Sequence, residues 1–200
     1  MTGPYEWNPM PHIVSVRCPD CGAQAKFEFA EGRRIELRKD IAYFQTSKDF
    51  DYATVRDYGG GNCHVAVYYH GLGRRALGSI NDLPDGYTQD DWQHSRYLMR
   101  SHDSHTGAIS CAKCGLQITH HLDWPTDAFF QIEFWGNVLW AFDRESASEL
   151  LTYIASEDRT RQNFVYKSFL MEIPTVFLTR KARETVVKKL AAVLAKGMTS

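Results

Sequence analysis

Four of the five cysteines stand in two copies of one short motif. VRCPDCGAQA carries Cys18 and Cys21, and ISCAKCGLQI carries Cys111 and Cys114, each pair with two residues between and a glycine behind. A C-x-x-C turn brings two thiolates to one ion, and tetrahedral zinc takes four such ligands. The glycine suits a backbone with positive φ. The sequence therefore predicts one structural Zn²⁺ shared by the two motifs.

Other uses of the cysteines are open. A redox dithiol usually stands at the start of a helix, and neither motif has that setting. Iron in a rubredoxin-like site is an alternative, because a tetrahedral four-sulfur site binds both metals. The fifth cysteine, Cys63, precedes His64, and neighbouring strand residues face opposite sides, which argues against a nucleophile–base pair.

Strand patterns flank both motifs. Residues 13–17 lead into the first, and residues 23–29 leave it with alternating side chains that place Glu28 on the polar face. Residues 107–110 and 116–122 flank the second motif in the same way. Two hairpins that face one ion form a zinc ribbon.

The ribbon is interrupted by 89 residues between its two motifs. We expect an α+β fold: a zinc ribbon with antiparallel β-hairpins, a β-rich insertion between the knuckles, and C-terminal helices. The expected organisation is a single domain over 1–200, with knuckles at 10–30 and 106–124, the insertion at 31–105, and a hairpin plus helices at 125–200.

Within the insertion, IELRKDIAYF (35–44) and CHVAVYYHG (63–71) predict strands, and DDWQHSRYLMR (90–100) predicts a short helix. We expect these strands to extend the ribbon's sheet, because neither end of the insertion has the composition of a linker. HGLGRRALG places Arg74 and Arg75 among glycines, a pattern that suits a phosphate or partner contact. It lacks the lysine and hydroxyl residue of a P-loop, so a plain exposed turn is the simpler interpretation.

All eight histidines lie between His12 and His121. His94, His102 and His105 precede the second motif, and a second metal there would support a hydrolase or nuclease. Acidic ligands are sparse beside them, with Asp103 the best placed. Surface imidazoles that hold no metal are the simpler interpretation.

The last third of the chain predicts a hairpin and helices. FFQIEFWGNVLWAF (129–142) alternates around a turn at Gly136-Asn137, and Asp143 is the expected cap of the helix that follows. A further helix is expected over about 159–171. The last, over about 179–196, is basic, but residues 125–200 hold ten Lys/Arg against nine Asp/Glu, which favours a solvated face over a nucleic-acid surface.

The composition is that of a globular protein, with 44% hydrophobic residues and a formal net charge of −1. This balance argues against a generic nucleic-acid coat. The start of the chain has neither the basic nor the apolar region of a secretory signal, and no apolar run is long enough for a membrane helix. Cysteines arranged for metal rather than disulfides indicate a cytoplasmic protein with no membrane partner.

Two segments carry a resemblance to a known group. CAKCGLQITHHLDWPTDAFFQIEFWGNVLWAFDRESASELLTYIASEDR and LPDGYTQDDWQHSRYL resemble bacterial proteins described as zinc-ribbon-containing. These share the CxxCG knuckle, a DWP-type turn and a hairpin that leads into a helix. The resemblance implies zinc at the four motif cysteines and implies no enzyme activity.

The expected function is that of a zinc-stabilised, non-enzymatic binding or adaptor protein with a protein or nucleic-acid partner. Its contacts would be Arg74 and Arg75, or an aromatic side chain such as Trp92 or Trp135. The alternatives are a metal-dependent hydrolase or nuclease in the His94/His102/His105 region and a rubredoxin-like electron carrier.

Overall fold

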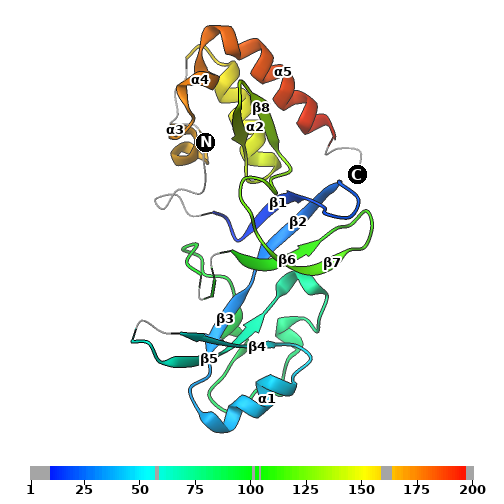
Figure 1. The fold of residues 1–200 in the computed structure, drawn as a ribbon, viewed down its shortest axis with the longest axis vertical. Helices are drawn as coiled ribbons and strands as arrows, with labels where there is room; N and C mark the ends of the chain where they lie inside the picture. Colours follow the sequence, from blue (N-terminus) through cyan, green and yellow to red (C-terminus); the bar gives the residue numbers. More distant parts are fainter. Residues whose placement is uncertain (1–9, 57–58, 101, 104, 159–163, 197–200) are drawn as a thin grey trace. The chain divides into compact units, whose positions relative to one another are not determined.

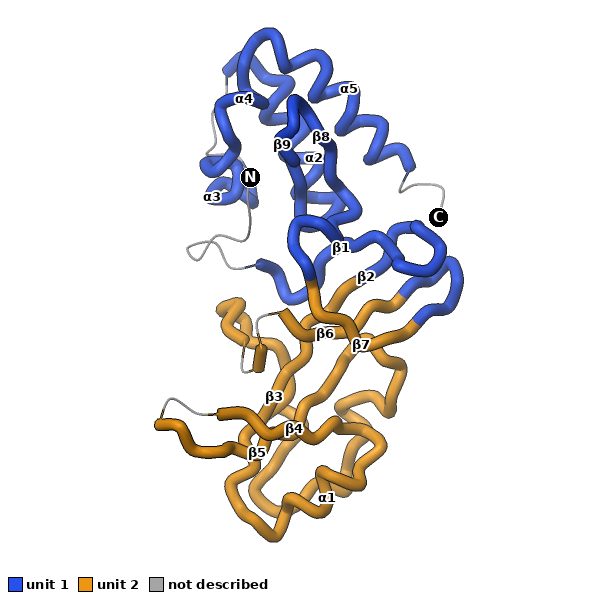
Figure 2. The backbone as a smooth tube through the Cα atoms, in the orientation of Figure 1, with its two compact units in different colours: residues 1–26, 111–116, 123–200 blue, residues 27–110, 117–122 orange. Residues whose placement is uncertain are grey.

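The computed structural model describes residues 10–56, 59–100, 102–103, 105–158 and 164–196. The chain divides into two compact units, drawn in different colours in Figure 2. Unit 1 comprises residues 1–26, 111–116 and 123–200, and unit 2 comprises residues 27–110 and 117–122. Compactness does not measure whether the units unfold together, so one cooperative domain over 1–200 stays a prediction.

The strands around the knuckles form the expected hairpins. β1 (Ile13–Arg17), β2 (Gln24–Phe29), β6 (Thr106–Ser110) and β7 (Gln117–His121) belong to one four-stranded sheet in the order β1-β2-β6-β7 (Figure 1). β6 and β7 pair antiparallel. A Cβ on Gly107 would lie 2.4 Å from the backbone oxygen of Glu28, so only glycine permits the close approach at this point.

A second hairpin in unit 1 turns one residue earlier than expected. β8 (Gln131–Phe134) pairs with β9 (Asn137–Trp140), and Phe134 lies opposite Asn137. The turn is therefore Trp135-Gly136, not Gly136-Asn137. Both turn residues have positive φ, +50° and +71°, as the favoured two-residue hairpin turns require.

The helices of unit 1 follow this hairpin. α2 (Arg144–Ala155) begins where expected, because the Asp143 carboxylate accepts from the Ser146 backbone N–H at 2.8 Å and the Ser146 hydroxyl bonds back. α3 (Lys167–Met171) and α4 (Thr175–Leu178) are short, and α5 (Arg180–Lys196) closes the unit. The helix expected over 159–171 is described only from 164 onward and is helical from Lys167; residues 159–163 lie outside the described part.

Aromatic packing forms the interior of unit 1. Trp140 and Phe142 both contact Phe169 of α3, with ring centroids 5.4 and 5.1 Å apart. α2 and α5 pack on each other through apolar faces that include the fully buried Leu150 and Val186. The apolar stripes of the two helices thus cover each other, as their periodicity requires.

The strands of the insertion form their own sheet in unit 2 instead of extending the first. β3 (Glu31–Arg34), β5 (Asn62–Tyr68) and β4 (Asp51–Arg56) are antiparallel in the order β3-β5-β4. The prediction of a strand over 35–44 is wrong. This segment holds the 3₁₀ turn η1 (Arg38–Asp40) and the start of α1 (Ile41–Thr46). Its apolar residues pack as a helical turn, with Phe44 fully buried.

Three further 3₁₀ turns complete unit 2: η2 (His70–Leu72), η3 (Leu77–Ser79) and η4 (Gln89–Trp92). The short helix expected over 90–100 is reduced to η4. Trp92 at its end is fully buried, and its indole N–H donates to the Ala66 carbonyl at 2.9 Å. Phe44 and Phe50 pack on its ring, with centroids 5.9 and 4.5 Å away. Trp92 is therefore a core residue and not the partner contact that the sequence suggested.

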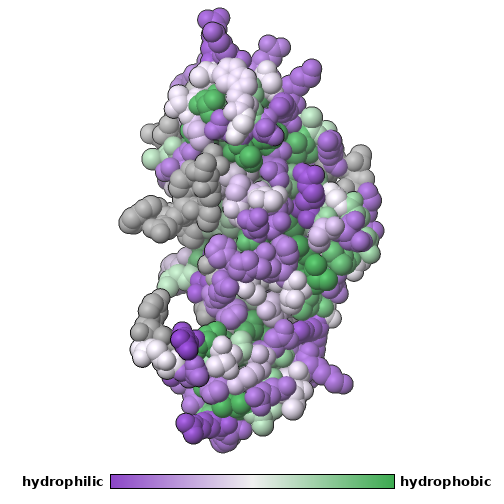
Figure 3. All heavy atoms as spheres, in the orientation of Figure 1, coloured by the Kyte–Doolittle hydropathy of each residue, from purple (hydrophilic) through white to green (hydrophobic). Residues whose placement is uncertain are grey.

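On the face drawn in Figure 3, hydrophilic side chains cover most of the surface and hydrophobic ones form small separate patches. Across the described ranges, the helices are too short or too polar to pass through a bilayer. Several large hydrophobic side chains remain exposed, and Trp135, which is 72% exposed, is one of them.

The two tryptophans should respond differently to truncation. Trp92→Ala should lower the free energy of unfolding by about 3–5 kcal/mol, because it leaves a cavity in the core of unit 2. Trp135→Ala removes a mostly exposed side chain and should change it by less than about 0.5 kcal/mol. Urea unfolding of both variants checks this, and a large loss at Trp135 would show that the hairpin tip is buried in solution.

Candidate metal centre

The four motif cysteines meet in unit 1, where their sulfur atoms all lie within 4.8 Å of one another. We call this set the four-cysteine cluster. Cys18 Sγ is 3.6 Å from Cys114 Sγ, and Cys21 Sγ is 3.7 Å from Cys111 Sγ. Tetrahedral zinc with bonds of about 2.3 Å separates its sulfur ligands by about 3.8 Å, whereas a disulfide needs about 2.05 Å. The cluster therefore fits a tetrahedral metal and not a pair of disulfides.

The same turn builds each half of the cluster. In the first, the Cys18 backbone N–H donates to Ala23 and its carbonyl accepts from Gly22, at 2.8 and 3.0 Å. In the second, Cys111 makes the equivalent bonds to Leu116 and Gly115, both at 2.9 Å. The repeated motif thus folds into a repeated geometry.

The glycine of each motif is set by backbone conformation. Gly22 has φ +70° and Gly115 has φ +77°, as the motif predicted. A Cβ at either position would meet nothing within 4 Å, so steric space is not the reason for glycine. The left-handed conformation alone favours it there.

The sulfurs differ in burial and in acidity. Cys18 and Cys111 are buried, and Cys21 and Cys114 are exposed. The hydrogen bond from the Cys114 backbone N–H is the main influence that lowers the pKa of Cys111 to about 7. At Cys114 the bond from the Leu116 backbone lowers the pKa, but partial desolvation and hydrogen bonds with the neighbouring thiols outweigh it and raise the pKa to about 12. The first thiolate forms readily, but its negative charge opposes ionisation of the neighbouring thiols. A cation is therefore needed before all four can be ionised.

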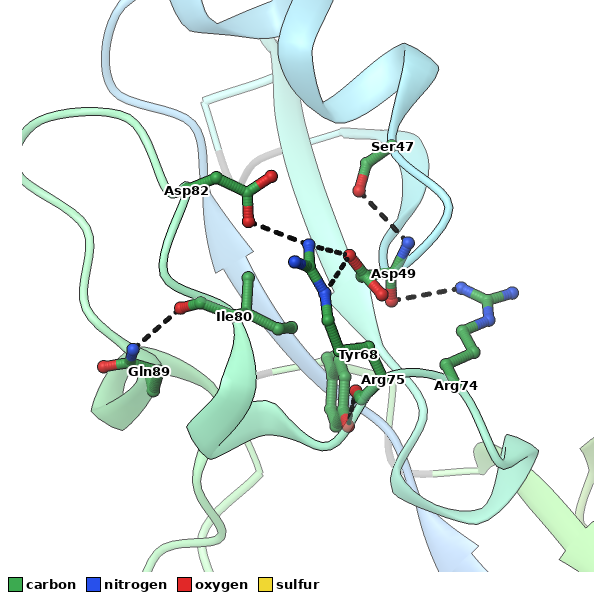
Figure 4. Close-up of polar contacts among 8 residues, drawn as sticks. All are labelled: Ser47, Asp49, Tyr68, Arg74, Arg75, Ile80, Asp82 and Gln89. Atoms are coloured by element: carbon green, nitrogen blue, oxygen red, sulfur yellow. Dashed lines mark hydrogen bonds and ion pairs between the residues drawn. The ribbon is translucent and has the colours of Figure 1, made fainter.

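The two arginines of the glycine-rich turn lie in unit 2, already paired. Arg74 Nη2 is 2.7 Å from an Asp51 oxygen. Arg75 Nη2 is 2.5 Å from Asp49 and 2.8 Å from Asp82 (Figure 4). The Arg75 side borders a hollow of about 500 Å³. Three carboxylates against two guanidiniums mean that a phosphate would have to displace an ion pair. Their role as phosphate or partner contacts stays a prediction.

The three histidines before the second motif are not brought together as one ligand set. His94 lies between the carboxylates of Glu28 and Glu31, whereas the His105 ring faces His121 at 5.5 Å. Among the residues that the structure describes, no three-ligand group contains two of His94, His102 and His105. The predicted hydrolase or nuclease site at this trio has no geometric support there and stays a prediction.

Sequence reasoning missed the partners of His94. Glu28 was expected on the polar face of its strand, but it is buried. The sequence around Glu28 shows only a carboxylate at the end of a strand whose opposite face is aromatic. Such a pattern does not identify a histidine partner that is distant in the chain.

Comparison with known proteins gave no match to a protein-family model, a curated protein or a solved structure. These comparisons therefore do not support the resemblance to zinc-ribbon-containing proteins. The evidence for a metal at the four-cysteine cluster is the set of sulfur–sulfur distances.

Loss of one ligand should release the metal. Because a structural zinc site supplies on the order of 10 kcal/mol, Cys18→Ser or Cys114→Ser should lose the metal of the four-cysteine cluster and have greatly lowered thermal stability. Elemental analysis and a thermal melt measure both effects. Cys63→Ser is the control, since Cys63 is buried in β5 outside the cluster. Metal retained at full stoichiometry in Cys114→Ser would contradict a shared site.

Metal binding should also release protons. The pKa values of Cys21 and Cys114 are raised, so both thiols are protonated at pH 7 without metal and must ionise to bind it. We expect at least two protons per zinc at pH 7, measured with an indicator dye in weak buffer, and weaker binding as the pH falls. Zinc uptake with no proton release would mean that the ligands are not these thiols.

Proposed function

We propose that the chain is a zinc-stabilised, non-enzymatic binding protein of the bacterial cytoplasm, built on a zinc ribbon, and that its partner is single-stranded nucleic acid. Four thiolates complete the coordination shell of one structural Zn²⁺ and leave no position for a substrate. The ion thus serves the fold, and the partner binds elsewhere on unit 1.

The observation that carries the proposal is Trp135. Its indole is 72% exposed at the tip of the β8–β9 hairpin, in a backbone conformation that costs a non-glycine residue roughly 1 kcal/mol or more. Asparagine or aspartate would fit this turn position better. The ring stacks on Phe134, with centroids 4.7 Å apart and planes at 21°. A rigid, exposed aromatic ring in a costly conformation is suited to stacking on a ligand.

A basic helix lies beside this hairpin, and its position next to an exposed aromatic ring is the reason to prefer a nucleic-acid surface over the solvated face that the charge balance of residues 125–200 favours. α5 contains six Lys or Arg residues and one acidic residue, and it packs beside β8 (Figure 1). The Lys189 ammonium donates to the Glu133 carbonyl at 2.6 Å, two residues before Trp135. This bond ties the lysine side of α5 to the strand that leads to the indole.

The lysines of α5 line one side of the helix. Residues seven apart lie nearly above one another along a helix, so two such pairs form two neighbouring rows. All four are exposed: Lys181 with Lys188, and Lys189 with Lys196. An exposed aromatic ring next to a row of cations is the combination that binds single-stranded nucleic acid, because bases stack and phosphates neutralise the lysines.

Binding to a fluorescent single-stranded oligonucleotide tests the proposal. Trp135→Ala should weaken binding by roughly 5- to 100-fold, through loss of one base stack. The affinity should also fall with salt, and Lys188→Ala should reduce the salt slope by about 0.7. Lys189 is left intact because it holds the hairpin.

The matched control is Met171→Ala, which truncates another exposed apolar side chain of unit 1 and should leave binding unchanged. No binding at low salt, or binding that Trp135→Ala leaves intact, would contradict the proposal. A protein partner would be indicated by a ligand whose affinity depends on Trp135 and not on the lysines.

A further inference from the structure

Unit 2 holds a second group of side chains at metal-binding distance. Glu28 at the end of β2, His70 at the start of η2 and His94 after η4 each place one ligand atom within 4.8 Å of the others. The Glu28 side chain is 10% exposed and that of His94 is 18% exposed. The chain thus brings three ligands from distant segments into a site that is largely shielded from water.

Each histidine of this group is oriented by a second hydrogen bond. His94 Nδ1 is 2.8 Å from Glu31 Oε1, a carboxylate that is itself 3% exposed. His70 Nε2 is 2.9 Å from the Trp92 carbonyl oxygen, which can only accept a hydrogen bond. The His70 proton is therefore on Nε2, and Nδ1 carries the lone pair. A carboxylate or carbonyl behind each imidazole is the usual support of metal-binding histidines.

The spacing within the group differs from that of a simple ion pair. His94 Nε2 lies 3.3 Å from Glu28 Oε1, whereas a charge-assisted hydrogen bond is about 2.7–2.9 Å. Two ligands on a tetrahedral ion with bonds of about 2.0 Å are separated by about 3.3 Å. The same histidine is therefore at hydrogen-bond distance from Glu31 and at ligand distance from Glu28.

Two buried carboxylates, Glu28 and Glu31, approach opposite nitrogens of the same imidazole. A divalent cation beside Glu28 would take His94 Nε2 as a ligand while Nδ1 keeps its bond to Glu31.

From these contacts we propose that Glu28, His70 and His94 form a second metal site, which binds a first-row divalent ion of the zinc type. Two imidazoles and one carboxylate suit such an ion better than Mg²⁺ or Ca²⁺, which prefer oxygen ligands. Three protein ligands leave a fourth position for water, unlike the four-cysteine cluster. The alternative hydrolytic function would have its ion here and not at the His94/His102/His105 trio.

Metal counting on the full chain tests the site. Protein loaded with Zn²⁺ should bind two ions, Glu28→Gln and His94→Ala should bind one, and Cys18→Ser should lose the other. His121→Ala is the matched control, because its side chain is 70% exposed and pairs with Asp103 instead. One ion in the wild type with all four cysteines occupied, or two ions in both Glu28→Gln and His94→Ala, would overturn the proposal.

A second measurement does not depend on the folding of those variants. Cobalt added to wild type that carries a single Zn²⁺ ion, in the four-cysteine cluster, should give weak visible bands of a nitrogen–oxygen site, without the strong sulfur-to-metal bands of the four-cysteine cluster. Glu31→Gln keeps all three ligands and loses only the support of His94, so it should weaken cobalt binding by roughly 10- to 100-fold with unchanged stoichiometry. Absence of the visible bands in the wild type, or a Glu31→Gln affinity equal to that of the wild type, would count against the site.

Discussion

Mutual repulsion of four sulfur atoms is the constraint on which the knuckle region depends. At separations of 3.6 and 3.7 Å, thiolates cannot all be charged unless a cation lies among them. Backbone N–H groups in the two turns ease ionisation, as the lowered pKa of Cys111 shows, but they do not do so for every sulfur. A metal bound among the four sulfurs would therefore hold the two hairpin ends together as much as their hydrogen bonds do.

Part of this structure can be predicted from the sequence, because it is determined by residues that are close together in the chain. The C-x-x-C-G motif specifies its turn through residues within five positions, and Asp143 with Ser146 specifies the start of α2 over four. The mixed α+β character, the antiparallel hairpins and the C-terminal helices follow from such local signals, and the structure confirms them at that level. Zinc as the occupant goes beyond what a sulfur geometry decides, since iron takes the same site.

Other parts of the fold and of the candidate sites could not be predicted from the sequence, because they depend on packing between residues that are distant in the chain. The segment 35–44 alternates well enough for a strand, yet Phe44 is needed in the aromatic core around Trp92, and a helical turn places it there. A short apolar run does not distinguish the two periods. Glu28 has the same difficulty, because its burial depends on His94, which lies 66 residues away in the chain. At the β8–β9 turn, Trp135 occupies a position that turn preferences assign to other residues, so the sequence pattern places the turn one residue too late.

Because of the long interval between the knuckles, an ion bound to both would cross-link distant parts of the chain. An ion that joins Cys21 to Cys111 closes a loop containing 89 residues, and closure of a loop this long lowers the entropy of the unfolded chain by an amount worth about 4.6 kcal/mol. Most of unit 2 lies within that loop. Its folding therefore starts from a chain with joined ends whenever the metal is bound, although none of its residues is a ligand in the four-cysteine cluster. Metal supply would in this way govern the stability of a region that the ion does not touch.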